Sequence, residues 1–442
     1  RQRQMCIRDR GGSLDIQASN SLSLLGLHRG TLVNAGRKMT NFPSFITAST
    51  YSSQPAGNIT ITTRSLNTDG IITANTHGEG KAGNLIFNVD NMNLTGGGFI
   101  TSVSGAKGAS GNICITATDT VSINGRNQSE VFEYPINTSQ SFIGTYSFGE
   151  GNAGNVIISA STFIVDDGRL STATGGDGAG GNIVINVKNL QVNNSGTIDS
   201  NTTAFFENWR VGNGKGGNIK ITANDITVSG TGSRISSDTF NVSSGGNVNI
   251  EANKLTITDS GTISAKSQDT GNAGKIIVQA HTVKLANQGN ISAQAENAAG
   301  GNITVITPNQ FYLQNGQMTT SVGTGKGKGG NITIENPTFV VLNQGKIRAQ
   351  ADAGQGGNIR IKSEQFIASP DSLVSASSRL GLDGEVNIDS PTVDMNAFMV
   401  ILPGGYVENA KLKRCTHKEI ENPSTFKVDL TRKRTVPFGM LK

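Results

Sequence analysis

The sequence predicts an all-β protein in which most of the chain coils as a right-handed parallel β-helix. A phrase of glycine, asparagine and alternating apolar residues recurs with a base spacing of 27 residues, as is typical of stacked repeat proteins. The apolar residues alternate with polar ones, which indicates strands with one buried face. No unit shows the i, i+3, i+4 pattern of a helix. The right hand is expected because it is the common form of such crossovers.

A glycine marks the start of each repeat unit. It recurs at Gly57, Gly83, Gly111, Gly154, Gly181, Gly217, Gly246, Gly274, Gly301, Gly330, Gly357 and Gly384. Asparagine follows it in ten of these twelve units, and Lys275 and Glu385 are the exceptions. With a degenerate earlier copy that begins at Gly12, the spacing predicts about 13 rungs.

Each unit contains three short strands, exemplified by Gly301–Val305, Lys254–Thr258 and Gly261–Ala265. In the first strand, apolar pairs such as Ile219 and Ile221 are expected to point inward. Three strands and three turns cannot bury both sides of a flat sheet, but they can close into one rung of a coil. Successive rungs would pair in parallel about 4.8 Å apart, with three sheets around a narrow apolar core.

The glycine before each asparagine is expected to lie at a corner between sheets. It would supply a positive φ there and let neighbouring rungs approach closely. The stacked asparagines would form hydrogen bonds along the coil and tolerate left-handed conformations. Five GxGxxG matches belong to the same corners, and each precedes a strand instead of following one and opening a helix. No bound cofactor is therefore expected.

Composition divides the chain into three segments. Residues 1–10 share nothing with the repeats and resemble a translated adapter read-through, so we expect them to be non-native. Residues 11–390 form the predicted β-helix, and residues 391–442 form a basic C-terminal segment. Within the latter, residues 411–442 carry nine Lys or Arg against three acids. Because the chain begins with Arg1 and not Met, we interpret it as an N-terminally truncated fragment.

Several function classes are disfavoured by composition. The net charge is +5, but the repeats have no basic face with stacking aromatics, so no nucleic-acid partner is expected. No apolar stretch approaches the ~20 residues that cross a bilayer. Three cysteines without CxxC and four unclustered histidines predict neither a disulfide framework nor a metal site. Cys114 should point away from the core as a free thiol.

The repeats GGNIVINVKNLQVNNSGTIDS (180–200) and GGNVNIEANKLTITDSGTISA (245–265) resemble those of filamentous-haemagglutinin-like exoproteins of the two-partner secretion system. The resemblance covers about residues 11–390, and the stretch 402–438 is similar to the tail of many such proteins. It implies export through an outer-membrane barrel partner, followed by display at the bacterial surface or release as an adhesin. The family's N-terminal secretion domain is not visible here.

Binding residues are expected where insertions break the period, since exposed loop aromatics flanked by charge suit contact with a glycan or protein. The insertions span about residues 28–44, 126–140 and 202–213. The first two should leave the same corner, three rungs or ~14 Å apart, and the third a different one. The candidate residues are Phe132, Tyr134, Phe205, Phe206, Trp209 and Arg210. The alternative is that these rings only pack the loops against the coil.

The function that we expect is a secreted or cell-surface adhesin, a rigid stalk without catalytic residues that presents loops to host-cell or matrix glycans or proteins. One alternative is a β-helix polysaccharide lyase or hydrolase, which would need carboxylates stacked on one face. Asp199, Asp238 and Asp259 instead fall at different places in their units. A toxin stalk would need a larger C-terminal domain. Open coil ends predict end-to-end self-association.

Overall fold

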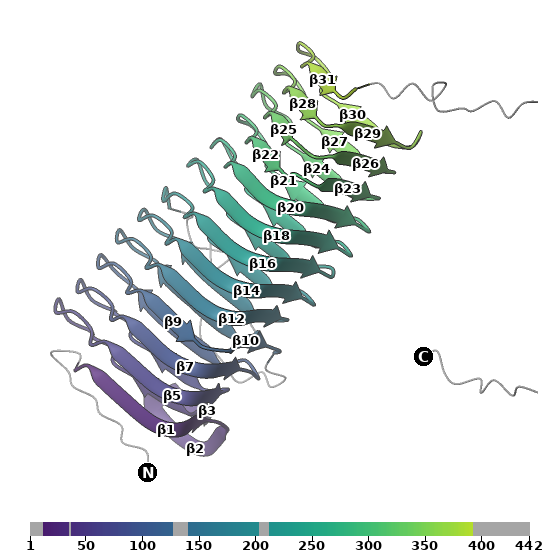
Figure 1. The fold of residues 1–442 in the computed structure, drawn as a ribbon. Helices are drawn as coiled ribbons and strands as arrows, with labels where there is room; N and C mark the ends of the chain where they lie inside the picture. The colour runs from purple at the N-terminus through teal and green to yellow at the C-terminus, as the bar shows by residue number, and fades with distance from the viewer. Residues whose placement is uncertain (1–11, 35–36, 127–139, 203–211, 392–442) are drawn as a thin grey trace, which may run out of the picture. The chain divides into compact units, whose positions relative to one another are not determined.

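The computed structural model describes residues 12–34, 37–126, 140–202 and 212–391. In these residues the chain is all-β, and its rungs stack in chain order from β1 to β31 (Figure 1). One turn spans about 28 residues, and the stack has about 12 complete turns. The predicted parallel β-helix is therefore confirmed, and β31 begins the thirteenth rung.

Two large parallel sheets make up the described stack. The 17-stranded sheet contains β1 (Leu14–Leu24), β5 (Ile59–Thr68), β7 (Leu85–Leu94), β9 (Ile113–Ala117), β10 (Thr120–Asn124), β12 (Val156–Asp166), β14 (Ile183–Asn193), β16 (Ile219–Ser229), β18 (Val248–Thr258), β20 (Ile276–Ala286), β22 (Ile303–Ile306), β23 (Gln310–Gln314), β25 (Ile332–Glu335), β26 (Phe339–Asn343), β28 (Ile359–Lys362), β29 (Gln365–Ala368) and β31 (Val386–Asp389). The 12-stranded sheet contains β4 (Phe45–Thr47), β6 (Ile71–Thr73), β8 (Phe99–Ser104), β11 (Phe142–Ser147), β13 (Arg169–Thr174), β15 (Thr197–Asp199), β17 (Arg234–Ser236), β19 (Thr262–Ser264), β21 (Asn290–Ser292), β24 (Gln317–Thr319), β27 (Lys346–Arg348) and β30 (Leu373–Ser375). A separate antiparallel hairpin pairs β2 (Leu27–Asn34) with β3 (Arg37–Pro43).

The prediction of three separate sheets is wrong, because the first two strands of a unit share one sheet. In β18 the ladder to β20 runs to Ala252, skips one residue and resumes at Lys254. Asn253 and Lys254 are both exposed, so the inward positions change phase from Ala252 to Leu255. Two consecutive outward residues therefore bend the strand without ending it.

The bent strand is divided in two in four rungs, and in two of them the dividing segment contains a proline. β22 and β23 are separated by a segment that contains Pro308, and β25 and β26 by one that contains Pro337. Proline has no N–H for the ladder and is disfavoured within central strands. The rungs with an uninterrupted long strand, such as β14 and β16, have no proline at this corner.

A narrow apolar core runs along the described stack. The inward positions predicted for the first strand are confirmed, since Ile219, Ile221 and Ile359 are at most 1% exposed. Their outward neighbours Lys220 and Arg360 are exposed. Each fully buried Ile or Val side chain contributes about 1.5–3 kcal/mol relative to an exposed one.

We call the segment before each first strand, with its Gly–Asn pair, the asparagine corner. Its glycines were predicted to supply positive φ, and that is wrong for Gly83 and Gly301, because neither lies among the residues with positive φ. The predicted close approach is confirmed. A Cβ on Gly301 would lie 1.8 Å from the carbonyl oxygen of Gly274 in the preceding rung, and one on Gly83 would lie 1.9 Å from that of Gly57. Glycine is required here by packing.

Asparagine side chains link the rungs at this corner. The Oδ1 of Asn58 accepts a hydrogen bond from the backbone N–H of Asn84 at 2.8 Å, and the same bond repeats from rung to rung as far as Lys275. It resumes from Asn302 to Asn331 and continues to Glu385. The acceptor is always an amide oxygen, so Lys275, which has none, leaves a gap in the ladder.

The stack belongs to the unit Arg1–Thr392, and the unit Val393–Lys442 lies outside the described residues. No described part of the chain forms a helix long and apolar enough to span a membrane.

Candidate functional site

The six residues predicted for binding, Phe132, Tyr134, Phe205, Phe206, Trp209 and Arg210, all lie outside the described residues. The roots of their insertions are described. Arg126 and Gln140 form an antiparallel bridge directly before β11, and Thr202 pairs with Thr174 just after β15. The hairpin β2–β3 lies between β1 and β4. The first two insertions therefore leave the corner between the second and third strands, and the third insertion leaves another corner, as predicted.

We call this corner between the second and third strands the left-handed corner. Nine of the ten non-glycine residues with positive φ in the described chain occur there, and they are Asp167, Asn194, Ser195, Asp259, Ser260, Asn287, Gln288, Asn315 and Gln344. Asparagine and aspartate visit this region most readily, because their short polar side chains bond locally. The turn chemistry thus places a line of carboxamide, carboxylate and hydroxyl groups along neighbouring rungs.

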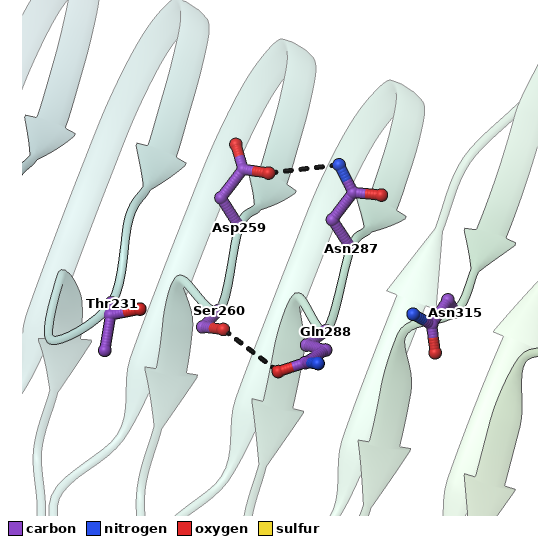
Figure 2. A pocket seen from close by; sticks show the side chains of 6 residues that line it. All are labelled: Thr231, Asp259, Ser260, Asn287, Gln288 and Asn315. Carbon is purple, nitrogen blue, oxygen red and sulfur yellow. Dashed lines mark hydrogen bonds between the residues drawn. The ribbon is translucent and has the colours of Figure 1, made fainter.

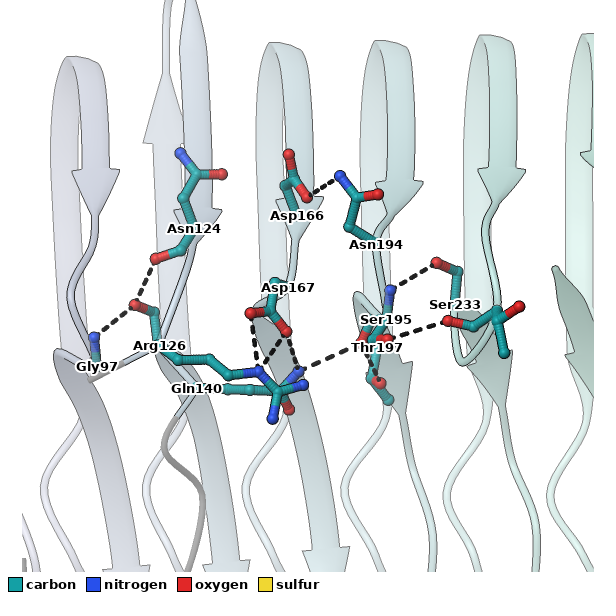
Figure 3. A network of polar contacts seen from close by, with 12 residues as sticks. Gly97, Asn124, Arg126, Gln140, Asp166, Asp167, Asn194, Ser195, Thr197 and Ser233 are labelled. Carbon is teal, nitrogen blue, oxygen red and sulfur yellow. Dashed lines mark hydrogen bonds and ion pairs between the residues drawn. The ribbon is translucent and has the colours of Figure 1, made fainter. Parts of the chain in front are cut away.

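A polar network occupies this corner beside the second insertion (Figure 3). The Nε of Arg126 lies 2.6 Å and 2.8 Å from the two carboxylate oxygens of Asp167. Gln140 donates to Asp167 Oδ1 at 3.1 Å and to the carbonyl oxygen of Ser195 at 3.3 Å. The two residues that flank the insertion therefore hold its ends against the next two rungs.

The adjacent aspartates of β12 and its turn take part in different contacts. Asp166 Oδ1 accepts from the side-chain amide of Asn194 at 2.7 Å, whereas Asp167 binds Arg126. Figure 3 shows their carboxylates pointing apart. The two neighbouring carboxylates therefore do not form one site.

The line of polar turns continues into a shallow open groove of about 320 Å³ (Figure 2). It is lined by Thr231, Asp259, Ser260, Asn287, Gln288 and Asn315. Asn287 donates to Asp259 Oδ1 at 3.0 Å, and Ser260 donates to Gln288 Oε1 at 3.2 Å. Asp259 also accepts from Ser229 at 3.1 Å, and these hydrogen bonds lower the pKa of its carboxyl group. The bonds fix the lining side chains without filling the groove.

A buried ion pair lies on the 12-stranded sheet, between the roots of the second and third insertions. Arg169 binds Asp199 through two parallel hydrogen bonds of 2.8 Å and 2.9 Å, and Ser171 donates to the same carboxylate at 2.6 Å. Asp199 is fully buried. Burial by itself disfavours the guanidinium charge, but the carboxylate holds the pKa of Arg169 above its ordinary value.

An aromatic row adjoins this ion pair on β8 and β11. The ring centroid of Phe142 lies 6.1 Å from that of Phe99 and 5.2 Å from that of Tyr146, and Phe148 extends the row at 6.4 Å. Tyr146 is fully buried, and burial raises the pKa of its hydroxyl to about 12. The row gives the root of the second insertion a rigid support.

The three aspartates considered as catalytic candidates occupy different environments. Asp199 is neutralised by Arg169, and Asp259 lies in the groove. Asp238 is half-buried, and burial raises the pKa of its carboxyl group although Lys266 N–H and Ser264 donate to it. Within the described ranges, no three His, Cys, Asp or Glu residues form a group that could hold a metal ion.

Cys114 is a half-buried free thiol at an outward position of β9, as predicted. His77 stacks on Tyr51 with ring centroids 4.5 Å apart, and burial lowers its pKa. The contact joins equivalent positions of two successive rungs, where Thr50 pairs with Thr76.

Among solved structures, the chain is similar to the HMW1 secretion domain from Haemophilus influenzae. The identity is 16%, the TM-score is 0.39, and the match covers 82% of this chain and 100% of that one. A similarity at this TM-score carries no argument about function. No protein-family model and no curated protein matches the chain.

Sequence reasoning did not identify the left-handed corner as a surface of interest. Its signal is the short polar pair before the glycine of each third strand, as in Asn194-Ser195-Gly196, Asp259-Ser260-Gly261 and Asn287-Gln288-Gly289. The pair recurs with the same period as the Gly–Asn phrase and is typical of a turn. Aligning the repeat units on this polar pair, in place of the Gly–Asn phrase, would have placed these side chains in neighbouring rungs.

Proposed function

We propose that this chain is the stalk of a secreted adhesin of the filamentous-haemagglutinin-like, two-partner class, displayed at the bacterial surface or released from it. The resemblance of its repeats supports this class. The proposed partners are an outer-membrane barrel for export and a glycan or protein of the host cell or matrix for adhesion. Its mechanism is geometric, because a stiff stack holds binding loops at fixed spacings.

The observation that carries the proposal is that the stack accommodates its insertions without losing register. Phe142, just after the second insertion, pairs with Phe99 of the rung before and with Arg169 of the rung after. Thr202, at the root of the third, still pairs with Thr174. An in-register scaffold with variable loops at its corners is a common arrangement for binding proteins.

The expectation that the chain has no catalytic activity is part of the same proposal. Of the three aspartates considered for a lyase or hydrolase, Asp199 is bound by Arg169 and Asp259 by the side-chain amide of Asn287. Asp238 accepts hydrogen bonds from Ser264 and from the backbone N–H of Lys266. Incubation of the full chain with acidic and neutral polysaccharides, followed by reducing-end assay, tests the alternative. Release of oligosaccharides would overturn the stalk proposal.

Adhesion is tested by binding of the full chain to host cells and to a glycan array. The matched variant replaces residues 203–211 with a short polar turn, and a second replaces residues 127–139 in the same way. Loss of binding with an unchanged β-sheet circular-dichroism signal supports a site on the altered loop. No binding by the unaltered chain to any cell or glycan would contradict the proposed function.

End-to-end association is a further part of the proposal. Among the described strands β31 pairs only with β28, and its Val386 and Ile388 are 41% and 38% exposed. A free edge with apolar side chains favours pairing with another chain. Sedimentation over a range of concentrations should show multimers, and a single monomeric species would contradict this part.

A further inference from the structure

The open groove of Figure 2 offers unused hydrogen-bonding groups in a regular order. Asn287 uses its amide N–H to bind Asp259, and Gln288 uses its amide oxygen to accept from Ser260. The oxygen of Asn287 and the N–H₂ of Gln288 therefore remain available. The side chains of Asn315 and Thr231 take part in no hydrogen bond within the described chain.

These groups are repeated along the stack. Thr231, Asp259–Ser260, Asn287–Gln288 and Asn315 come from four consecutive rungs, which follow one another at about 4.8 Å. Donors and acceptors are thus presented along one line, and their backbone is fixed by left-handed turns. A ligand that matches this line must itself carry hydroxyl groups at short, regular intervals.

The charge of the groove limits the class of ligand. Neither Lys nor Arg is among its lining residues, so an anionic polymer would find no cation there. The single carboxylate, Asp259, already accepts hydrogen bonds from Asn287 and Ser229, so it is compensated without a cation. The lining is otherwise carboxamide and hydroxyl groups, which bind neutral hydroxyls well.

We propose that this groove binds an extended, neutral oligosaccharide, with successive sugar hydroxyls bonded to successive rungs. The inference deepens the proposed function and rests on it, since it names a ligand class for the adhesive stalk. The groove is shallow and has no aromatic lining, so its affinity for one oligosaccharide chain is weak. Useful adhesion comes from several grooves that bind several oligosaccharides at once.

The test removes the side chains without straining the backbone. The triple variant Asn287→Gly, Gln288→Gly and Asn315→Gly keeps the positive φ values of 46°, 66° and 47°, which glycine adopts freely. The matched control is Asn336→Gly, a left-handed residue with φ 63° that does not line the groove. Thermal unfolding by circular dichroism reports whether each variant is folded.

The probes are neutral manno-, gluco- and galacto-hexasaccharides and their sulfated counterparts, immobilised at high density. The unaltered chain and Asn336→Gly are expected to bind a neutral hexasaccharide equally, and the triple variant to bind at least about tenfold less. Equal binding by a folded triple variant would overturn the inference, and so would binding of sulfated probes alone. Host-cell binding measured in parallel separates the two proposals. If the cells are bound but the groove variant makes no difference, the groove inference fails and the adhesin proposal stands.

Discussion

The asparagine corner and the left-handed corner use the same residue types for different physical purposes. At the first, glycine is needed because the preceding rung leaves no room for a Cβ, and asparagine links rungs through its amide oxygen. At the second, asparagine is needed because the backbone is left-handed, and its side chain remains partly free. A repeat can therefore keep glycine and asparagine at one corner for packing between rungs and at another corner for a left-handed backbone conformation.

The largest expected loss of stability distinguishes glycines required by close packing from glycines required by a positive φ. Gly301→Ala would put a Cβ 1.8 Å from a backbone oxygen and should destabilise the chain by about 3 kcal/mol. Gly125→Ala, at φ 71° with nothing within 4 Å of the new Cβ, should cost only about 1 kcal/mol. Urea unfolding midpoints measure both. Equal costs would mean that packing does not distinguish the corners.

A smaller loss is expected from breaking one link of the asparagine ladder. Asn331→Ala removes the oxygen that accepts from the N–H of Asn358 and should destabilise the chain by about 1 kcal/mol. The faster exchange of the Asn358 amide proton should report the lost bond directly. An unchanged exchange rate at this amide would show that the ladder contributes nothing there.

The gap in the ladder predicts a gain of similar or smaller size. Lys275→Asn supplies an amide oxygen beside the next rung and should stabilise the chain by about 0.5 kcal/mol. Chemical unfolding of this variant, with Lys275→Ala as the control for removal of the lysine side chain, measures the effect. Equal stability of the two variants would show that no new bond forms.

A pH-dependent effect should distinguish two aspartates. The raised pKa of Asp238 means that its charged form weakens the fold at neutral pH, and this penalty disappears as pH falls below the ordinary carboxyl pKa. Asp238→Asn should therefore be stabilising at pH 7 and neutral at pH 3. Asp259→Asn should show the opposite sign, because the pKa of Asp259 is lowered and its charge favours the fold at neutral pH. Unfolding midpoints of both variants, measured at pH 7 and pH 3, test these expectations. An increase in stability of both variants at pH 7 would contradict the opposite directions of the two pKa shifts.

Several features of the fold were predictable because they repeat. The inward positions of Ile219 and Ile359 follow from alternation with period two. The merging of the first two strands was not predictable, since two outward residues such as Asn253 and Lys254 look like a strand break in sequence. The Arg169–Asp199 pair joins positions 30 residues apart and depends on the register of β13 and β15. The predicted loop residues, among them Trp209, remain a prediction.

The sequence by itself determined the repeat, the strand alternation and the order of the rungs, because each depends on residues close together in one unit. Only the tertiary structure decided what each corner does. A glycine can be required because a carbonyl oxygen leaves no room for a Cβ, or because the backbone is left-handed. Which reason applies depends on the neighbouring rung, which lies about 28 residues away in the chain. The side-chain amides of Asn287, Gln288 and Asn315 likewise line one groove only when their rungs stack.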